Sequence, residues 1–339
     1  MEIEDFVEAC FELLDLNFGN TASSYFQFGP FVVEHRGLGE ASLPFFHLAI
    51  THLQKSAASY SDFVIYTVDA LETGIFLPKP CWDWNRVDGF GVIKEFSNHG
   101  FYADYQFDFD TFTLVDKNRN RALQWSKAVK KLPEWERSFP FRKIIYHFTN
   151  RTSCLMLHAG AVGTKEGGVL LAGAGGSGKS SATLACINSG LHYAGDDFIL
   201  LDLQTNQVHS LYNVAKLDEN GIKMFPQLES LLYNRDKVPE QKGQLFFSQH
   251  FPEKLILTFP LKCILLPKFS GGRDTMVYDA SPGDVLRALA PSTLALLKAD
   301  ETYFSKISGI VRNWPAFHLQ TGTDLPQIPL SILNLLENI

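Results

Sequence analysis

The sequence predicts an α/β protein in two parts, a β-rich α+β domain over residues 1–140 and an α/β domain over residues 141–339. Aromatic and β-branched runs separated by Gly, Pro and Asn fill the first part, which is typical of short strands and turns. In the second part apolar runs alternate with helical patterns, and one strand–helix pair encloses a glycine-rich segment at 173–180. A chain of 339 residues exceeds the usual size of one compact domain, which favours two.

Composition and charge indicate a globular protein and exclude several classes of function. Apolar residues make up 45%, charged residues 20%, and the formal net charge is -7. Lys and Arg are scattered, so we expect no nucleic-acid partner. Acidic residues stand where a signal peptide would be basic, and no apolar run has the length of a membrane span, so we expect a cytoplasmic protein with no membrane partner. The five cysteines form no CxxC pair and no Cys/His cluster, which favours free thiols over a zinc or redox site.

The first domain is predicted to open on an amphipathic helix, because apolar residues recur at helical spacing from Ile3 to Leu14. Strands are then expected within residues 25–35, 62–70, 90–96 and 101–115. Within the last of these, Tyr105, Phe107 and Phe109 alternate with polar residues, which predicts a half-exposed strand. A turn is expected at residues 116–120, and a connector with a helix at residues 133–150.

The second domain is predicted to alternate strands and helices. Short apolar runs ended by glycine predict strands, and amphipathic runs predict helices. The expected strands are 154–163, 167–175, 198–203, 261–269 and 315–322, and the expected helices are 179–190, 282–298, 301–314 and 331–339.

The segment from residue 173 to residue 180 fits the phosphate-loop pattern GxxxxGK[ST] at every defined position. Glycines let the backbone curl so that successive N–H groups face a phosphate, and Lys179 would bridge the β- and γ-phosphates of a nucleotide while the Ser180 hydroxyl binds Mg²⁺. We therefore expect ATP and Mg²⁺ to bind here. The expected nucleotide-binding residues are Gly173, Ala174, Gly175, Gly176, Ser177, Gly178, Lys179, Ser180 and Ser181.

Two adjacent carboxylates follow the loop lysine by 17 and 18 residues, at Asp196 and Asp197. A short helix and a brief return segment would bring them back to the mouth of the loop. Two adjacent carboxylates suit a division of labour in which one holds Mg²⁺ and the other accepts the proton of an attacking hydroxyl. Taken alone, the pair is more typical of a solvated turn before a strand, but its distance from the phosphate loop favours a role in the site.

These residues resemble the HPr kinase/phosphorylase family and the related serine kinases, whose core is similar to that of ATP-dependent phosphoenolpyruvate carboxykinase. In that family a strand histidine lies 21 residues before the loop lysine, and His158 has this spacing here. The resemblance implies that Lys179 and Ser180 serve phosphate and Mg²⁺, that Asp196 and Asp197 are metal-linked carboxylate and general base, with Asp197 preferred as the base, and that His158 lines the site. From the residue alone, a strand histidine is usually a packed core residue.

Other residues in the C-terminal half remain open in the sequence. The "RGLGI"-type signature that true HPr kinases carry after the aspartates is missing, and "NVAKLDENGIKMFP" stands in its place. In that segment Lys216 could approach a phosphate and Glu219 could replace the missing acid, although a solvated loop is the simpler interpretation of each. The family also places a basic residue further on, and the candidates are Arg235, Lys242 and Arg273.

The resemblance implies an ATP-dependent kinase that transfers the γ-phosphate to a serine hydroxyl of a protein or peptide, for which a ribosomal precursor of the lasso type is one candidate. The N-terminal domain would then hold the acceptor, by pairing a strand with an open sheet edge. Two alternatives stay open: a small-molecule kinase, for example for free serine, and a nucleotide-binding sensor without transfer activity. Family members often assemble through the kinase core, which makes a homo-oligomer compatible with the sequence.

Overall fold

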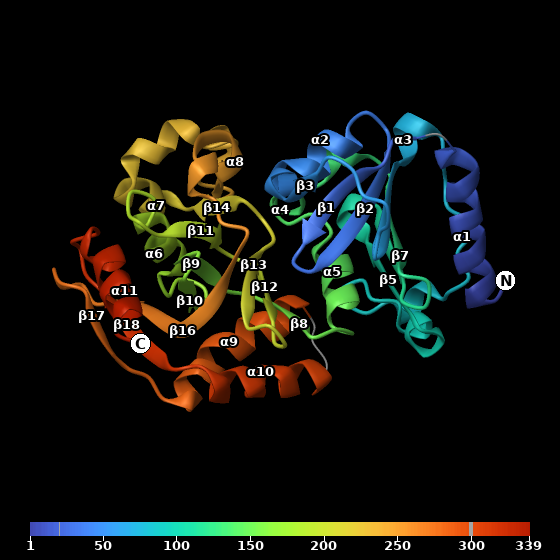
Figure 1. Ribbon diagram of the computed structural model, residues 1–339. Coiled ribbons are helices and arrows are strands. Elements are labelled where there is room, and N and C mark those ends of the chain that lie inside the picture. The colour runs from blue at the N-terminus through green and yellow to red at the C-terminus, as the bar shows by residue number, and fades with distance from the viewer. Residues whose placement is uncertain (20, 298–300) are drawn as a thin grey trace. The chain divides into compact units, whose positions relative to one another are not determined.

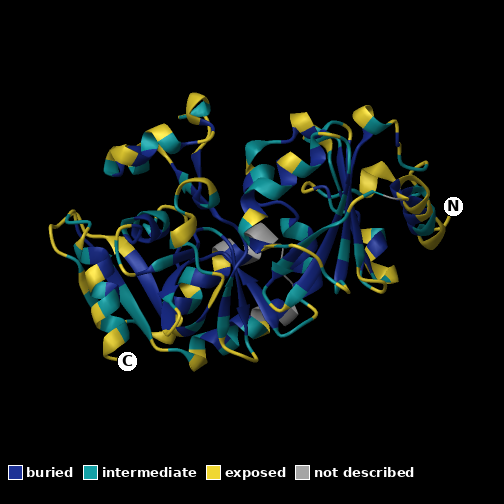
Figure 2. Ribbon diagram, turned by 45° about the horizontal axis from the view of Figure 1, so that its top comes forward, coloured by how far each residue is buried: buried dark blue, intermediate teal, exposed yellow. Residues whose placement is uncertain are grey.

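The computed structural model describes residues 1–19, 21–297 and 301–339. The chain has a mixed α/β structure with several sheets and divides into two compact units, Met1–Arg151 and Thr152–Ile339 (Figure 1). The expected boundary near residue 140 lies inside the first unit. In both units the strands are largely buried, and exposed residues gather on loops and on the outer sides of helices (Figure 2).

The N-terminal unit is built on a mixed sheet with the strand order β3-β1-β2-β4-β7-β6-β5. Strand β4 runs parallel to both β2 and β7, and the other neighbours are antiparallel. The elements are α1 (Ile3–Phe18), β1 (Ser24–Phe28), β2 (Phe31–Leu38), α2 (Ser42–His47), β3 (Gln54–Lys55), β4 (Phe63–Asp69), α3 (Ala70–Thr73), β5 (Phe101–Gln106), β6 (Thr111–Asp116), β7 (Arg121–Ser126), α4 (Glu134–Ser138) and α5 (Arg142–Thr149).

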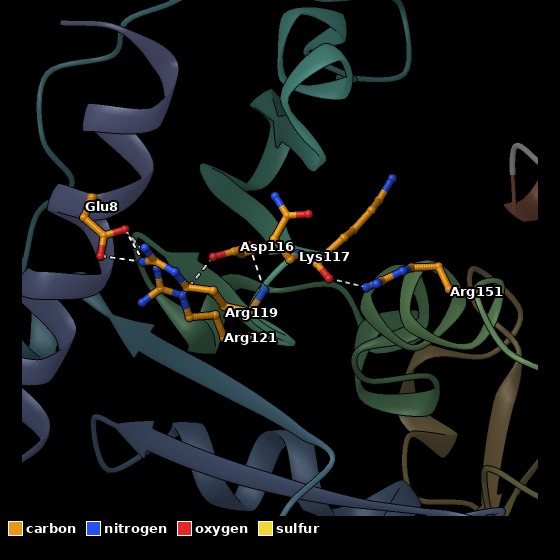
Figure 3. Close-up of polar contacts among 7 residues, drawn as sticks. Glu8, Asp116, Lys117, Arg119, Arg121 and Arg151 are labelled. Carbon is orange, nitrogen blue, oxygen red and sulfur yellow. Dashed lines mark hydrogen bonds and ion pairs between the residues drawn. The ribbon is translucent and has the colours of Figure 1, made fainter.

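Helix α1 forms where its apolar spacing predicts it, and it buries that face against the sheet. The ring of Phe6 packs edge-on against Trp82 and Phe112, with centroid distances of 5.3 and 6.0 Å. Ion pairs from Glu8 to Arg119 and Arg121 connect the helix to the β6–β7 turn (Figure 3). These contacts hold α1 on the sheet through one apolar face and one charged edge.

Two predicted strand segments take other conformations. Residues 90–96 form isolated bridges and then a 3₁₀ turn, Lys94–His99. The alternating segment around Phe107 is a hairpin, because β5 ends at Gln106 and the chain turns through Asp110, which has a φ of 47°. A turn that exposes Phe107 shows the same alternation of apolar and polar residues as a half-exposed strand, so the pattern misled the prediction. The turn expected at residues 116–120 forms between β6 and β7.

Helix α5 explains why the division between units falls after Arg151. Its Phe148 ring lies against Phe63 of β4 at 4.5 Å, and the Lys143 ammonium pairs with Asp104 of β5 at 2.6 Å. The helix therefore packs on the sheet of the N-terminal unit, although it follows the sequence change near residue 140.

A buried histidine pair lies between strand β2 and helix α2. His35 is fully buried, and its two ring nitrogens lie 2.7 Å from Nε2 of His47 and 2.9 Å from Oγ1 of Thr67. Burial lowers the pKa of His35 well below its ordinary value, with a further contribution from His47. Burial also lowers the pKa of His47 to about 4. Both rings are therefore neutral in the folded protein near neutral pH.

We expect the N-terminal unit to lose stability as the pH falls from about 6.5 toward 4, the pKa of His47. In this window the unfolded chain binds protons that the folded state excludes, so stability falls with falling pH. Urea unfolding followed by tryptophan fluorescence reports this, since four of the five tryptophans, Trp82, Trp84, Trp125 and Trp135, lie in this unit. His47→Gln should reduce the slope of stability against pH in this window, and a slope equal to that of the wild type would contradict the assignment.

The C-terminal unit contains a larger mixed sheet with the order β11-β9-β10-β16-β13-β12-β8, in which β18 also pairs with β16 and β17, and a separate pair, β14-β15. The strands are β8 (Cys154–Leu157), β9 (Gly160–Thr164), β10 (Gly167–Leu171), β11 (His192–Gly195), β12 (Ile199–Asp202), β13 (Gln207–Ser210), β14 (Val214–Leu217), β15 (Gly243–Phe246), β16 (Thr258–Phe269), β17 (Met276–Asp279) and β18 (Ala316–Thr321). The helices are α6 (Lys179–Ala185), α7 (Glu219–Met224), α8 (Phe247–His250), α9 (Pro282–Leu297), α10 (Glu301–Asn313) and α11 (Gln327–Glu337).

Several predicted elements of this unit differ in their limits. The run at 154–163 splits at His158 into β8, which pairs with β12, and β9, which pairs with β10. Helix α6 ends at Ala185 rather than at Gly190, and the chain continues in turns to β11. Lys298, the last residue of the helix expected at 282–298, lies outside the described residues. Within the described residues, no helix is both long enough and apolar enough to cross a bilayer.

The register of this sheet brings three chain segments together at one edge, which is formed by the ends of neighbouring strands. Gly160 at the start of β9 pairs with Leu171 at the end of β10, and Gly195 at the end of β11 pairs with Ala161. The turn before β9, the loop after β10 and the turn after β11 therefore meet at the same edge. Helices α6 and α11 pack on one face of these strands (Figure 1).

Candidate active site

A glycine-rich loop, residues 172–178, joins β10 to α6 at this edge. Its backbone is left-handed at Gly176 and Gly178, with φ values of 78° and 102°, which residues with a side chain rarely adopt. A Cβ at Gly173 would lie 2.4 Å from Oγ of Ser177, so the closure of the loop also requires glycine there. The middle of the loop is exposed. A curled loop of this kind can present backbone N–H groups to an anion.

Lys179 begins helix α6 and turns back into the loop. Its ammonium donates to the carbonyl oxygens of Gly173 at 2.7 Å and Ala174 at 3.2 Å, and the residue is buried. Burial lowers the pKa of Lys179, whereas the charges of Asp196 and Asp197 raise it. The lysine therefore lies within electrostatic range of both carboxylates. The next two positions of the helix, Ser180 and Ser181, are half-buried.

Asp196 follows β11 and is buried against helix α6. Its carboxylate accepts hydrogen bonds from the hydroxyl of Thr183 at 3.4 Å and from the backbone N–H of Lys216 at 3.3 Å, and it also contacts the hydroxyl of Ser180. Burial, and then the charge of Asp197, raise the pKa of Asp196. Asp196 is thus the carboxylate nearest to the serine that follows the loop lysine.

The carboxylate of Asp197 contacts a histidine and a lysine. Its carboxylate lies 3.3 Å from Nε2 of His158 and 2.8 Å from Nζ of Lys216. Burial alone would raise the pKa of Asp197, but the hydrogen bond from His158 and the charge of Lys216 lower it below the ordinary value of aspartate. The two neighbouring carboxylates therefore have opposite pKa shifts, one raised and one lowered.

His158 lies in the turn between β8 and β9 and is buried. Its backbone N–H donates to the hydroxyl of Thr293 at 3.2 Å, and its ring packs edge-on against Phe198 at 5.4 Å. Nε2 faces Asp197, while Nδ1 is buried and has no hydrogen-bond partner among the described residues. His158 is therefore both packed and in direct contact with a carboxylate of the site.

Of the four basic residues considered from the sequence, the structure places two near the site and pairs the other two with acidic residues elsewhere. Lys216, on β14, is in the site through its ion pair with Asp197. The charge of Lys242 lowers the pKa of Lys179, so Lys242 is close enough to interact with the loop lysine. In contrast, Arg235 pairs with Glu229, and Arg273 lies 3.8 Å from Asp324.

Glu219, the candidate for the missing acid, is exposed in the first turn of α7, and within the part of the chain that the structure describes it makes no hydrogen bond or ion pair with Asp196 or Asp197. One contact of the site has no counterpart in the sequence analysis. Thr183 contacts Asp196 although no motif indicates it. Its spacing of three residues from Ser180 puts both hydroxyls on one face of α6, which is the signal that could have found it.

The oxygen atoms of Ser180 and Asp196 fit Mg²⁺ that is bound together with a phosphate, not a metal ion that is held by protein side chains alone. Among the described residues, no group of three or more His, Cys, Asp and Glu side chains could hold a metal ion. Mg²⁺ in nucleotide sites commonly takes one or two protein oxygens and completes its shell with phosphate oxygens and water. The contact between the Ser180 hydroxyl and the Asp196 carboxylate supplies such a set.

Comparisons with known proteins add one structural match. No protein-family model matches the sequence, and a search of curated proteins found no relative. A search of solved structures found the Hpr(Ser) kinase/phosphatase from Coxiella burnetii, with 15% sequence identity and a TM-score of 0.27, over 54% of this chain and 94% of that chain. A TM-score of this size does not establish a common fold, so the candidate function depends on the geometry of the site.

Proposed function

We propose that the C-terminal unit is a phosphate-loop kinase that transfers the γ-phosphate of ATP to a hydroxyl group, in the first place a serine of a protein or peptide. One observation carries the proposal: the loop lysine, the serine after it and two buried carboxylates meet at a single sheet edge, where Asp196 lies against helix α6 and Asp197 is held by His158 and Lys216. The two carboxylates also have opposite pKa shifts. Paired groups whose environments move their pKa values apart are a frequent property of sites that perform acid–base chemistry.

In this proposal each side chain has a separate role. The acceptor oxygen forms a bond to the γ-phosphorus, the bond from that phosphorus to the β–γ bridging oxygen breaks, and ADP leaves with the electron pair. The carboxylate of Asp197 takes the hydroxyl proton. Lys179 and Lys242 offset the negative charge on the transferred group.

Ser180 and Asp196 would hold Mg²⁺, which supplies charge neutralisation on the β- and γ-phosphates when bound. The lowered pKa keeps Asp197 ionised at neutral pH, so it is ready to accept a proton. His158 and Lys216 orient the Asp197 carboxylate through their contacts of 3.3 and 2.8 Å. The raised pKa of Asp196 is consistent with a group that is fully ionised only when a cation is beside it.

The choice of acceptor comes from the resemblance of the sequence and not from the geometry of the site. The resemblance of the loop, the aspartate pair and His158 to HPr-kinase-related serine kinases supports a peptide or protein serine, and a precursor peptide of the lasso type is one such acceptor. The N-terminal unit is a candidate for holding it. A small hydroxy compound such as free serine would use the same transfer chemistry.

A direct assay separates these acceptors. The full-length protein is incubated with Mg²⁺, γ-labelled ATP and an array of serine-containing peptides, and in parallel with free serine. We expect label on a peptide serine, identified by mass spectrometry. Label only on free serine would assign a small-molecule kinase, and tight ATP binding without transfer to peptide, serine or water would assign a nucleotide sensor and contradict the proposal.

Lys216→Met should shift the pH dependence of peptide labelling by about one unit, because the pKa of Asp197 moves up when a neighbouring positive charge is lost. The acidic limb of the pH–rate profile should move to higher pH, which loss of packing alone would not cause. The exposed Lys223→Met is the matched control. An unchanged acidic limb in Lys216→Met would contradict the role given to this ion pair.

A further inference from the structure

The arrangement of strands indicates the direction in which a nucleotide would lie across the loop. Asp196 and Asp197 follow β11, which is on the β9 side of β10. In the proposed function these carboxylates mark the γ-phosphate end. The nucleoside end then extends toward the opposite side of β10, where β16 is the neighbouring strand.

Strand β16 continues past the end of β10 on that side. The last parallel pair is Leu171 with Leu265, and β16 runs on to Phe269. The side chain of Pro267 faces the loop, since its Cβ lies 4.0 Å from the position that a Cβ at Gly178 would take. The extension of β16 is therefore next to the beginning of helix α6.

Side chains alternate along a strand, so Phe269 lies on the same face of β16 as Pro267. Its position is about 7 Å farther along the strand. Neighbours on this face are buried: Leu265 and Leu319 are each 0% exposed. Phe269 is 55% exposed. An exposed aromatic ring thus follows a buried proline at the side of the loop where the nucleoside would emerge.

We propose that Phe269, adjoining Pro267, is the stacking surface for the nucleobase of the nucleoside triphosphate. This inference rests on the proposed function and adds a base subsite to the phosphate site. Bases stack on exposed aromatic rings because each base has a flat π-face, and loss of one such ring commonly weakens binding by about tenfold or more.

Two ligands that differ only in the nucleoside test the subsite. Binding of Mg·ATP and of Mg·tripolyphosphate is measured by calorimetry for the wild type, Phe269→Ala, Phe269→Trp and Lys179→Ala. Phe269→Ala should weaken ATP binding about tenfold and leave tripolyphosphate binding unchanged, and Phe269→Trp should retain ATP binding. Lys179→Ala should weaken the binding of both ligands, because it changes the phosphate site.

Met276→Ala is the matched control. Met276 is an exposed apolar residue of the same part of the sheet, but its register with Gln320 and Lys268 puts it on the opposite face.

If Phe269→Ala leaves ATP binding unchanged, or weakens both ligands equally, the base subsite is wrong while the phosphate site stands. A change of sedimentation coefficient in Phe269→Ala with unchanged ATP binding would assign the ring to a contact between copies of the chain. Absence of binding of either ligand to the wild type would overturn the proposed function as well.

Discussion

Replacing Asp197 with asparagine should lower the rate of phosphoryl transfer to a peptide serine by about 10²–10⁴-fold. Asparagine keeps the size of the side chain and can still contact His158 and Lys216, but its amide cannot take a proton from the acceptor. The affinity for Mg·ATP should change by only a few-fold, because the phosphate groups are held by the loop and by Lys179. Initial rates of peptide labelling and calorimetric titration of Mg·ATP measure the two effects separately.

Asp196→Asn and Asp236→Asn provide the comparison for this prediction. Asp196 contacts the Ser180 hydroxyl, so its replacement should weaken Mg²⁺-dependent nucleotide binding as well as transfer. Asp236 is exposed in a 3₁₀ turn and should change neither. If Asp197→Asn retained the wild-type transfer rate while Asp196→Asn lost transfer at unchanged nucleotide affinity, the two roles would have to be exchanged.

Replacing Lys179 with alanine should reduce both nucleotide affinity and transfer, with a loss in rate of about 10³-fold or more. The ammonium is buried beside the carbonyl groups of Gly173 and Ala174 and within range of both aspartates, so another part of the chain cannot easily supply this charge. Lys179→Arg should not restore function, because the planar guanidinium is larger than the ammonium and does not fit a site of this size.

Lys165→Ala is the control for a loss of positive charge in the same unit, since Lys165 is exposed in the turn between β9 and β10. It should retain wild-type binding and transfer. Circular dichroism of Lys179→Ala should match the wild type. Normal ATP affinity in a folded Lys179→Ala protein would show that the loop does not hold the phosphates.

The loop and its surroundings could be predicted largely from the sequence, because their constraints are local. Glycine is required at Gly176 and Gly178 by positive φ angles, and a short helix and return strand fix the distance from Lys179 to the aspartates. The apolar spacing of α1 likewise predicts both its position and its buried face, since helical periodicity depends on neighbours within a few turns.

The contacts of Lys216 and Lys242 in the site could not be predicted in this way. Lys216 reaches Asp197 from β14, and Lys242 acts on Lys179 from a position just before β15, so both depend on where a separate strand pair lies against α6. The sequence shows each only as a lysine in a polar segment. The hairpin at Phe107 was also beyond a pattern argument, because a turn and a half-exposed strand show the same alternation of apolar and polar residues.

The central claim is that the triphosphate of ATP lies on the loop with its γ-phosphate facing Asp197. A crystal structure with Mg²⁺ and a non-hydrolysable ATP analogue tests it most directly. The account predicts the β-phosphate against the backbone amides of the loop, Lys179 turned from the loop carbonyls to the phosphates, and the Asp197 carboxylate beside the γ-phosphate. An analogue bound elsewhere, or bound on the loop with its γ-phosphate directed away from both aspartates, would contradict it.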